Sequence, residues 1–425
     1  MPSFSPQHYI QIGRRLGISP TVLARAGAVG TRITANAPDR AVVFSLRHLS
    51  ALSGVPYRLL RDWVGRWGPD PYREFFIAKK SDNRRTNKPS VRPKRRIAAP
   101  TPDLMRQQRW LVERVLHHAP RHPASMAFHR DADIVETARL HCKCNWLIKM
   151  DIRNFFESIY EPAIFKVFID LGYPRLLAFE LTRLCTRIVP ENRLEWKTGL
   201  RHGLFDPRRG PKFYNRVRGT PDVTGRRTIH TRDRFHEWAM GAVGSDRMPL
   251  PLGSLPQGAP TSPLLANLAV RALDERITLI AAEHDLVYTR YADDVALSTQ
   301  RKDFTRKEAV QVIGKVLREF EREGLRPHHA KTRLISPGAR KIVLGLAVDG
   351  NTPRLTREYR NKLRLHAHML GARGINPSAH ATALRFRSVV SMRRHIEGKI
   401  AHAHRVEPAF ADDIKAKLQG VDWTL

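Results

Sequence analysis

The sequence predicts an α+β fold, in which apolar strands that meet acidic residues are interspersed with amphipathic helices. One observation is a pair of strand-like segments, 286–290 and 295–298, both rich in β-branched and apolar residues. A second is the apolar run that begins at Trp146 and ends at Asp151, and a third is the helical periodicity of 264–282 and 306–323. Together they predict a mixed fold rather than an all-helical or all-β one.

Two adjacent carboxylates lie between the first pair of strands, in the string Tyr291-Ala292-Asp293-Asp294. Neighbouring aspartates at a hairpin tip repel one another, and a divalent cation would relieve that repulsion. Carboxylate oxygens suit Mg²⁺, which binds through one or two carboxylates plus substrate phosphates. The alternative is a solvated Asp-Asp turn, so this string is suggestive only in combination with other motifs.

A third acid, Asp151, ends the apolar run that begins at Trp146. Two-metal phosphoryl transfer needs carboxylates from separate strands, which hold the cations about 3.5–4 Å apart. Between the acids lies Leu-Pro-Gln-Gly-Ala-Pro-Thr-Ser-Pro, residues 255–263. Gly258 there permits close approach of backbone to a ligand. Ser262 is expected to be an N-cap, with Pro263 at the first helical position.

These three motifs, in this order, resemble those of the reverse transcriptases. Asp-x-x-x-Phe-Phe at 151–156, the nine residues 255–263 and Tyr-Ala-Asp-Asp at 291–294 correspond to the palm motifs A, B and C. The resemblance implies a right-hand polymerase architecture with fingers, a palm of antiparallel sheet plus helices, and a helical thumb. The boundaries expected are 1–70 for an N-terminal helical region, 71–350 for fingers and palm, and 351–425 for the thumb.

The N-terminal part resembles the bacterial retron-type members of that family. Residues 1–70 are expected to form short amphipathic helices, and 45–55 is expected to start a helical hairpin packed on the next domain rather than a DNA-reading helix-turn-helix. The string Tyr72-Arg-Glu-Phe-Phe-Ile-Ala-Lys-Lys80 follows, with Ala78 where the family usually has Pro. After a polar loop at 81–93, Arg95 begins the fingers strand, and Asp103 is expected to cap a helix through Leu116.

The resemblance implies a role for each candidate site residue. Asp151, Asp293 and Asp294 would be catalytic, and together with Ile152 they would hold two Mg²⁺ ions. Lys331, in the motif D segment 325–333, would be the general acid for the departing pyrophosphate. The nucleotide-binding residues would be Arg95 at the triphosphate, Phe156 as the steric gate that excludes a ribose 2′-hydroxyl, and Gln257 and Gly258 under the nucleotide. The nucleic-acid-binding residues would be His141, Tyr291, Gly345, Arg393 and Arg394.

Some of these assignments leave an alternative open. His141 matches the histidine of a retron-type string before motif A, so RNA contact competes with ordinary packing. The pair His328-His329 lacks a carboxylate at ligand spacing, which favours surface or nucleic-acid contact over a metal site. Ile342–Val348 is expected to be one short buried strand of the motif E hairpin, with its turn at 349–351.

Two further regions are basic. Residues 190–250 are expected to be either an insertion that contacts RNA or DNA, or a solvated loop. The Val-Thr-Gly at 223–225 matches a retron signature by chance, because that signature is expected after motif C. There this chain has Val-Leu-Gly, at 343–345. From Thr356 onward three basic helices, broken near 371–377 and at Pro408, are expected to form a thumb that binds a duplex backbone.

Composition agrees with a nucleic-acid partner. The chain of 425 residues has 74 Lys and Arg against 40 Asp and Glu, a formal charge of +34. This excess is spread through segments that look folded, which favours a phosphate backbone over a membrane surface as the partner. No apolar run is long enough to span a membrane. Three cysteines do not suggest a disulfide framework, so a reducing cytoplasm is expected, and the resemblance to retron-type enzymes implies a bacterial one.

The function predicted from this pattern is RNA-directed DNA synthesis. Its expected partners are a cognate non-coding RNA, the cDNA copied from it, dNTPs and an effector protein, in a retron-type anti-phage defence system. One alternative is a defence-associated polymerase that makes untemplated or protein-primed DNA. Another is an inactive scaffold that binds RNA, against which the intact acids and the intact Gln-Gly loop argue. A group II intron maturase is disfavoured because its DNA-binding and nuclease extensions are not seen.

Overall fold

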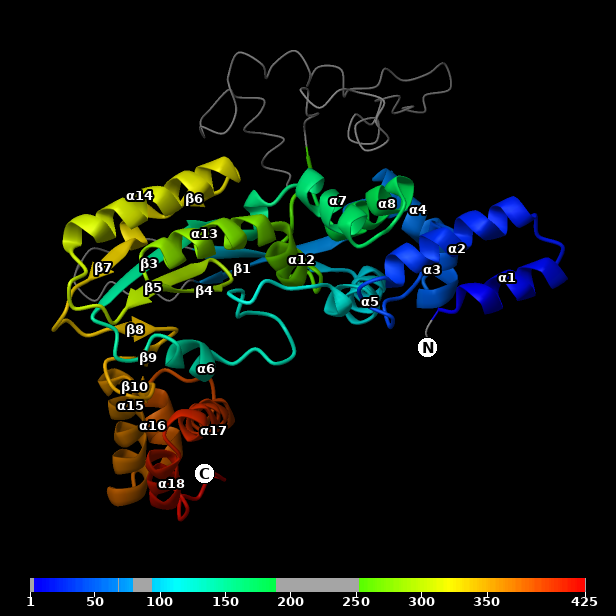
Figure 1. The fold of residues 1–425 in the computed structure, drawn as a ribbon. Helices are drawn as coiled ribbons and strands as arrows, with labels where there is room; N and C mark the ends of the chain where they lie inside the picture. The colour runs from blue at the N-terminus through cyan, green and yellow to red at the C-terminus, as the bar shows by residue number, and fades with distance from the viewer. Residues whose placement is uncertain (1–3, 68, 79–93, 189–251, 425) are drawn as a thin grey trace, which may run out of the picture. The chain divides into compact units, whose positions relative to one another are not determined.

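The computed structural model describes residues 4–67, 69–78, 94–188 and 252–424. The basic segment 190–250, with its Val-Thr-Gly, and the loop 81–93 lie outside the described residues. The chain divides into two compact units. Figure 1 shows the helices and strands coloured by residue number. The first unit comprises residues 1–129, 152–276 and 317–327, and the second comprises 130–151, 277–316 and 328–425.

The first unit begins with four short helices, as the sequence predicts: α1 (Pro6–Arg15), α2 (Pro20–Thr34), α3 (Leu46–Ser53) and α4 (Tyr57–Gly65). The hydroxyls of Ser5 and Ser45 accept hydrogen bonds from the first turns of α1 and α3, which satisfies main-chain donors there. Helix α3 packs on α5 (Pro102–Arg114) and α4 packs on α8 (Arg175–Cys185). This packing confirms the prediction of a helical hairpin held against the following segments.

A two-stranded ribbon and a helix follow in the same unit. Strand β1 (Tyr72–Ala78) pairs antiparallel with β2 (Lys94–Pro100), which confirms the predicted fingers strand. The cap predicted for α5 was wrong, because the N-cap is Thr101 and Asp103 lies inside the first turn. A carboxylate there still favours the positive end of the helix dipole. A 3₁₀ turn (Leu116–His118) continues beyond α5.

Helices α7 (Glu161–Asp170) and α8 pack together, and α12 (Ser262–Ala269) packs on α7. The single helix predicted over 264–282 is two helices, because α12 ends at a C-cap at Val270 and α13 covers Arg271–Glu283. The N-cap prediction was also wrong, since Thr261 precedes the helix and Ser262 is its first residue. The Ser262 hydroxyl instead donates to the Pro256 carbonyl at 2.7 Å, which ties the preceding loop to the helix.

The second unit is built on an antiparallel sheet. Strand β5 (Asp294–Thr299) pairs on one side with β4 (Val287–Tyr291) and on the other with β3 (Trp146–Arg153), which also pairs with β7 (Arg333–Ile335). These strands confirm the predicted hairpin around the Asp-Asp pair and the predicted strand through Asp151. Helix α14 (Arg306–Arg322) is the one predicted over 306–323. Helix α6 (Ile134–Arg139) precedes β3.

The predicted strand 342–348 was wrong, because it folds back on itself. Strands β8 (Ile342–Val343) and β9 (Leu346–Ala347) form a hairpin whose turn is Leu344-Gly345. Both turn residues have positive φ, 48° and 84°, as a two-residue type I′ turn requires. The predicted turn at 349–351 does exist, but it connects β9 to β10 (Arg354–Leu355).

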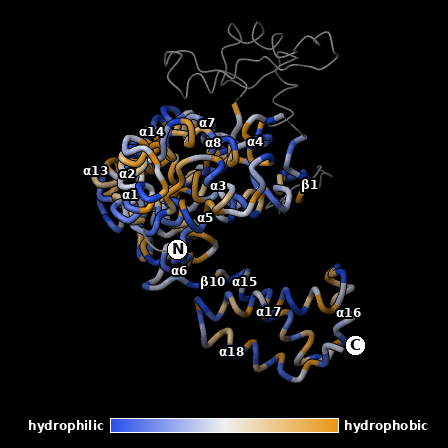
Figure 2. Tube along the Cα trace, turned by 90° about the vertical axis from the view of Figure 1, so that its right-hand side faces the viewer, coloured by the Kyte–Doolittle hydropathy of each residue, from blue (hydrophilic) through white to orange (hydrophobic). Residues whose placement is uncertain are grey.

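The C-terminal part of this unit is a helical bundle that contains four α-helices in residues 357–417, not the predicted three. They are α15 (Arg357–Ala367), α16 (Pro377–Ala383), α17 (Val389–Val406) and α18 (Pro408–Lys417), with a π-helical turn over His368–Ala372. The extra break precedes Ser388, whose side chain forms a capping box at the start of α17. Figure 2 shows hydrophobic and hydrophilic residues interspersed along each helix.

One hydrophobic core joins the sheet, the β8–β9 hairpin and the bundle within the second unit. It includes Leu147, Ala296, Val343, Leu363 and Ile396. All three cysteines are buried and unpaired, which agrees with the expectation of no disulfide framework. No helix in the described ranges combines the length and apolar character needed to cross a membrane.

Candidate active site

Two acidic residues face each other on neighbouring strands of the second unit. Asp151 on β3 is directly opposite Asp294 on β5. Residues opposite one another in an antiparallel pair point to the same face, with Cβ atoms about 4.5–5.5 Å apart. The Asp151 side chain is 8% exposed. The strands therefore bring together two acids that are far apart in the sequence.

The third acid lies in the turn that joins β4 to β5. Ala292 in that turn has φ of 57°, a conformation that costs energy for residues other than glycine and is often found at functional sites. The side chain of Arg290 is fully buried, and its Nη1 donates to the Ala292 carbonyl at 3.1 Å. This bond supports the strained turn, and the turn places Asp293 next to Asp294.

The surroundings of Asp293 and Asp294 disfavour the ionised forms of these two carboxyl groups. Burial is the main cause that raises the pKa of Asp293, and the charges of Asp151 and Asp294 raise it further. Burial likewise raises the pKa of Asp294, opposed by the nearby Lys149 ammonium. Both carboxylates are therefore harder to ionise here than in water, and positive charge at this place would favour their ionised forms.

A divalent cation fits this donor set, although the described residues contain no three His, Cys, Asp or Glu side chains arranged as a ready metal site. The available donors are carboxylate oxygens, which suit Mg²⁺. Burial first, and then the neighbouring carboxylates, raise the pKa values of Asp293 and Asp294, and a bound cation would oppose both effects. Ile152 was predicted as a ligand; its side chain is buried and has no donor atom, so only its main-chain carbonyl could serve.

Lys331 contacts the acids directly. Its Nζ lies 2.6 Å from Oδ2 of Asp151, and its own side chain is 57% exposed. A 3₁₀ turn (His329–Lys331) carries it, and the turn is fixed to β3 by a hydrogen bond from the His328 amide to the Asp151 carbonyl at 2.7 Å. The structure therefore places the predicted general acid beside a predicted metal ligand.

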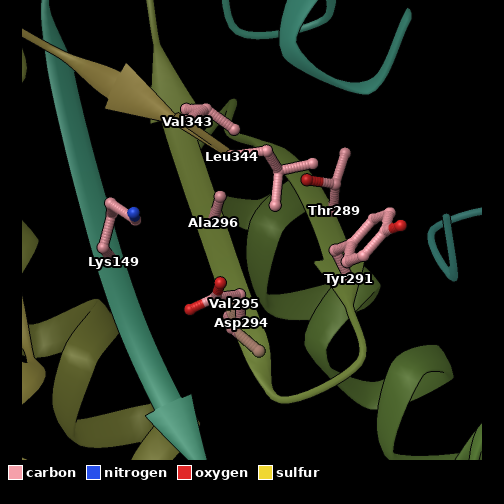
Figure 3. Close-up of a pocket in the computed structure, with 8 residues that line it drawn as sticks. All are labelled: Lys149, Thr289, Tyr291, Asp294, Val295, Ala296, Val343 and Leu344. Carbon is pink, nitrogen blue, oxygen red and sulfur yellow. The ribbon is translucent and has the colours of Figure 1, made fainter. Parts of the chain in front are cut away.

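A second lysine, which the sequence analysis did not single out, lies on the same face. Lys149 is opposite Ala296 on β5, and it lines a small pocket with Tyr291, Asp294 and Leu344. In Figure 3 the Lys149 ammonium points toward β5 and the Asp294 carboxylate points toward β3. The signal was present in the sequence, because Lys149 is two residues before Asp151 and alternate residues of a strand share a face.

His141 is fully buried and links the two strands of the hairpin. Its ring nitrogens lie 2.7 Å from the Ser298 hydroxyl on β5 and 2.7 Å from the Thr289 hydroxyl on β4. Burial, followed by the charge of Lys149, lowers the pKa of His141 to about 4. Of the two readings left open, these contacts favour packing over contact with RNA.

Replacing His141 by alanine is expected to lower the free energy of unfolding by about 2–4 kcal/mol, because a cavity forms and two buried hydroxyls lose a partner. Denaturant unfolding at pH 8 measures this, with exposed His329→Ala as the control. Because the folded-state pKa is below the ordinary 6.5, the contribution is present above pH 6.5 and is lost as pH falls toward 4. Equal unfolding energies for the two variants would contradict the structural role.

The first unit holds the predicted nucleotide-binding residues. The Gln257 carbonyl accepts a hydrogen bond from the Ala98 amide of β2 at 2.8 Å, so the 255–258 loop lies against the strand that carries the exposed Arg95. Gly258 has φ of 121°, and a Cβ there would lie 2.9 Å from the Ala98 carbonyl oxygen. No other residue fits this position without a shift of β2 or of the loop.

Phe156 and its neighbour Phe155 differ in environment. Phe155 is 3% exposed, whereas Phe156 is half-buried against the rings of Phe155 and Phe128, at centroid distances of 5.6 and 6.2 Å. The structure therefore leaves part of the Phe156 ring accessible within the first unit. A steric-gate role needs this accessibility, and it stays a prediction.

The predicted nucleic-acid contacts of the second unit are accessible to different degrees. Arg394 on α17 and Gly345 in the β8–β9 turn are exposed, and Tyr291 is half-buried at the pocket. Arg393 is exposed too, but its Nε bonds Glu397 at 2.8 Å and its guanidinium lies over the Trp423 ring at 5.7 Å. Arg394 thus has the more available guanidinium for a phosphate.

The raised pKa values of Asp293 and Asp294 also predict how stability depends on pH. A raised folded-state pKa means that the folded protein binds these protons more tightly than the unfolded chain does, so stability falls as pH rises through the folded-state values. Asp293→Asn with Asp294→Asn is therefore expected to raise the melting temperature at pH 8 in EDTA, with a smaller gain at acidic pH. Exposed Asp412→Asn with Asp413→Asn is the control for charge alone, and a lower melting temperature for the active-site pair would contradict the assignment.

The sheet with its acidic residues has the features of a polymerase palm, and the comparisons with known proteins agree. Residues 251–371 match the family described as "Reverse transcriptase (RNA-dependent DNA polymerase)". The chain is an RNA-directed DNA polymerase of mixed helix and sheet content.

Comparison with individual proteins shows which reverse transcriptases the chain is similar to. The chain is 26% identical over 297 residues to the Retron Ec86 reverse transcriptase of Escherichia coli, covering 70% of this chain and 69% of that protein. It is 25% identical over 342 residues to the Retron Mx162 reverse transcriptase of Myxococcus xanthus, covering 78% of this chain and 59% of that longer protein. Over 70–78% of its length the chain is therefore similar to retron reverse transcriptases. A structure of telomerase from Candida albicans aligns over 86% of this chain and 60% of that chain at a TM-score of 0.35 and 11% identity, a similarity too low to bear on the fold.

Proposed function

We propose that this protein copies a cognate structured non-coding RNA into DNA by two-metal nucleotidyl transfer. The observation that carries the proposal is the convergence in the second unit of Asp151 and Asp294 on facing strands, with Asp293 in the adjoining turn. The retron names of the relatives support an RNA template and dNTPs as substrates.

The chemistry would divide between cations and side chains. Bound Mg²⁺ would lower the pKa of the primer hydroxyl and offset the charge that develops on the leaving pyrophosphate. Asp151, Asp293 and Asp294 would supply the oxygen ligands. Lys331 would donate its Nζ proton to the departing pyrophosphate.

Residues of the first unit would select and hold the nucleotide. The Arg95 guanidinium would bind triphosphate oxygens, since its planar fork pairs bidentately with phosphate. Gln257 and Gly258 would support the nucleotide, and Phe156 would exclude a 2′-hydroxyl. In the second unit Tyr291, Gly345, Arg393 and Arg394 would contact primer or template. The resemblance to retron enzymes extends the proposal to a role in bacterial anti-phage defence, in the cytoplasm and together with an effector protein.

The proposal is tested by extending a DNA primer annealed to an RNA of defined sequence, with dNTPs and Mg²⁺, and sequencing the product. DNA complementary to the RNA supports templated synthesis. DNA that is not complementary to the RNA would overturn this proposal and would favour untemplated synthesis. RNA binding without any product would favour the scaffold alternative.

A further inference from the structure

The segment that carries Lys331 departs from regular pairing with β3 opposite Met150 and Asp151. On one side of it, Pro327 is opposite Ile152, and on the other side Arg333 is opposite Lys149. Two residues of β3, Met150 and Asp151, thus correspond to five residues, 328–332, of the partner segment. The three extra residues form a bulge, and bulges beside active sites commonly redirect a side chain.

Main-chain hydrogen bonds hold the bulge. The His328 amide bonds the Asp151 carbonyl at 2.7 Å, and the Lys331 amide bonds the His328 carbonyl at 2.8 Å. These bonds fix the Cα of Lys331 beside Asp151, whereas its side chain is 57% exposed. The ammonium can therefore leave the carboxylate by rotation of side-chain torsions, without disturbing the sheet.

Lys331 and Lys149 contact the acidic residues differently. The Lys331 ammonium makes a 2.6 Å ion pair with Asp151 Oδ2. Lys149 projects from β3 toward β5 and acts on Asp294 through its charge, in the pocket of Figure 3. Of the two cations, Lys331 is therefore the one bonded to a carboxylate oxygen that a divalent cation would need.

We propose that Lys331 is an internal counter-ion of Asp151, which occupies the carboxylate when no divalent cation is bound and is displaced when one binds. The inference rests on the proposed metal site and adds that the Lys331 ammonium and the divalent cation compete for the Asp151 carboxylate. An ammonium and a divalent cation cannot share Oδ2 at bonding distance without strong repulsion. Displacement also frees the ammonium, so Lys331 becomes available to the departing pyrophosphate once the cation is in place.

The experiment measures binding of Mn²⁺ alone to the full-length protein, freed of nucleic acid and metal, by electron paramagnetic resonance. The variants are Lys331→Met, which removes the charge and keeps a long side chain, and Lys331→Arg, which keeps the charge. Lys307→Met, at an exposed position of α14, controls for the loss of one charge elsewhere. Asp294→Asn reports whether Mn²⁺ binds at the carboxylates at all.

If the two cations compete, Lys331→Met should bind Mn²⁺ at least about fivefold more tightly than the wild-type protein does. This is the ratio expected when Mn²⁺ no longer has to break a partly exposed ion pair in order to bind. Lys331→Arg and Lys307→Met should stay within about twofold of wild type. Equal or weaker binding by Lys331→Met, with binding lost in Asp294→Asn, would overturn the counter-ion role and leave the metal site standing. Binding unaffected by Asp294→Asn would overturn the metal site and this inference together.

Discussion

Replacing Asp293 and Asp294 together by alanine is expected to abolish DNA synthesis and to leave RNA binding nearly unchanged. The change would remove two of the three proposed cation ligands, and the charge stabilisation that bound cations supply is worth several kcal/mol in the transition state. The rate of primer extension should fall by at least about 10³-fold. RNA binding, measured by filter retention, should persist because the chain carries a formal charge of +34.

The chain offers a matched control in a second pair of adjacent aspartates. Asp412 and Asp413 are both exposed on α18, and their ion pairs with His404 and Lys417 lie at the surface, where such pairs contribute little stability. Asp412→Ala with Asp413→Ala makes the same change in charge and should retain synthesis. Undiminished synthesis by the Asp293 and Asp294 variant would remove the assignment of the active site.

Replacing Phe156 by valine is expected to let the enzyme incorporate ribonucleotides. The smaller side chain would leave room for a 2′-hydroxyl, so the preference for dNTPs over rNTPs should fall by about 10- to 100-fold, while dNTP incorporation stays within about tenfold. The ratio of kcat/KM for dGTP and GTP on one template measures this directly.

Phe155→Leu is the matched control for this second prediction. Phe155 is the adjacent ring and is 3% exposed, so its truncation should cost stability without altering the choice of sugar. Two outcomes would contradict the gate: a Phe156→Val enzyme with unchanged discrimination, and an equal loss of discrimination in Phe155→Leu.

The strands and the acids of the site could be predicted because local pattern determines them. Composition alone specifies strands on both sides of Asp293-Asp294 and in the apolar run before Asp151. Once those strands pair, Asp151 lies opposite Asp294. The α14 boundaries followed from helical spacing that ends at Gly324, which has φ of 69°.

Three features of the site that the sequence did not reveal depend on contacts made in the folded chain. The 342–348 run reads as one strand because Leu344 is not a typical turn residue, and only pairing in the folded chain shows its φ of 48°. The ion pair of Lys331 with Asp151 joins residues 180 positions apart, through a bulge whose register no local pattern specifies. His141 likewise became interpretable when Ser298 and Thr289 were found at its two nitrogens.

The central claim, that this chain makes DNA from an RNA of its own, is tested most directly by sequencing the nucleic acid that purifies with the protein from its native cells. We expect one defined RNA joined to a DNA copy of part of itself, absent from the Asp293→Ala, Asp294→Ala protein. DNA of low complexity with no matching RNA, or RNA with no DNA attached, would contradict it.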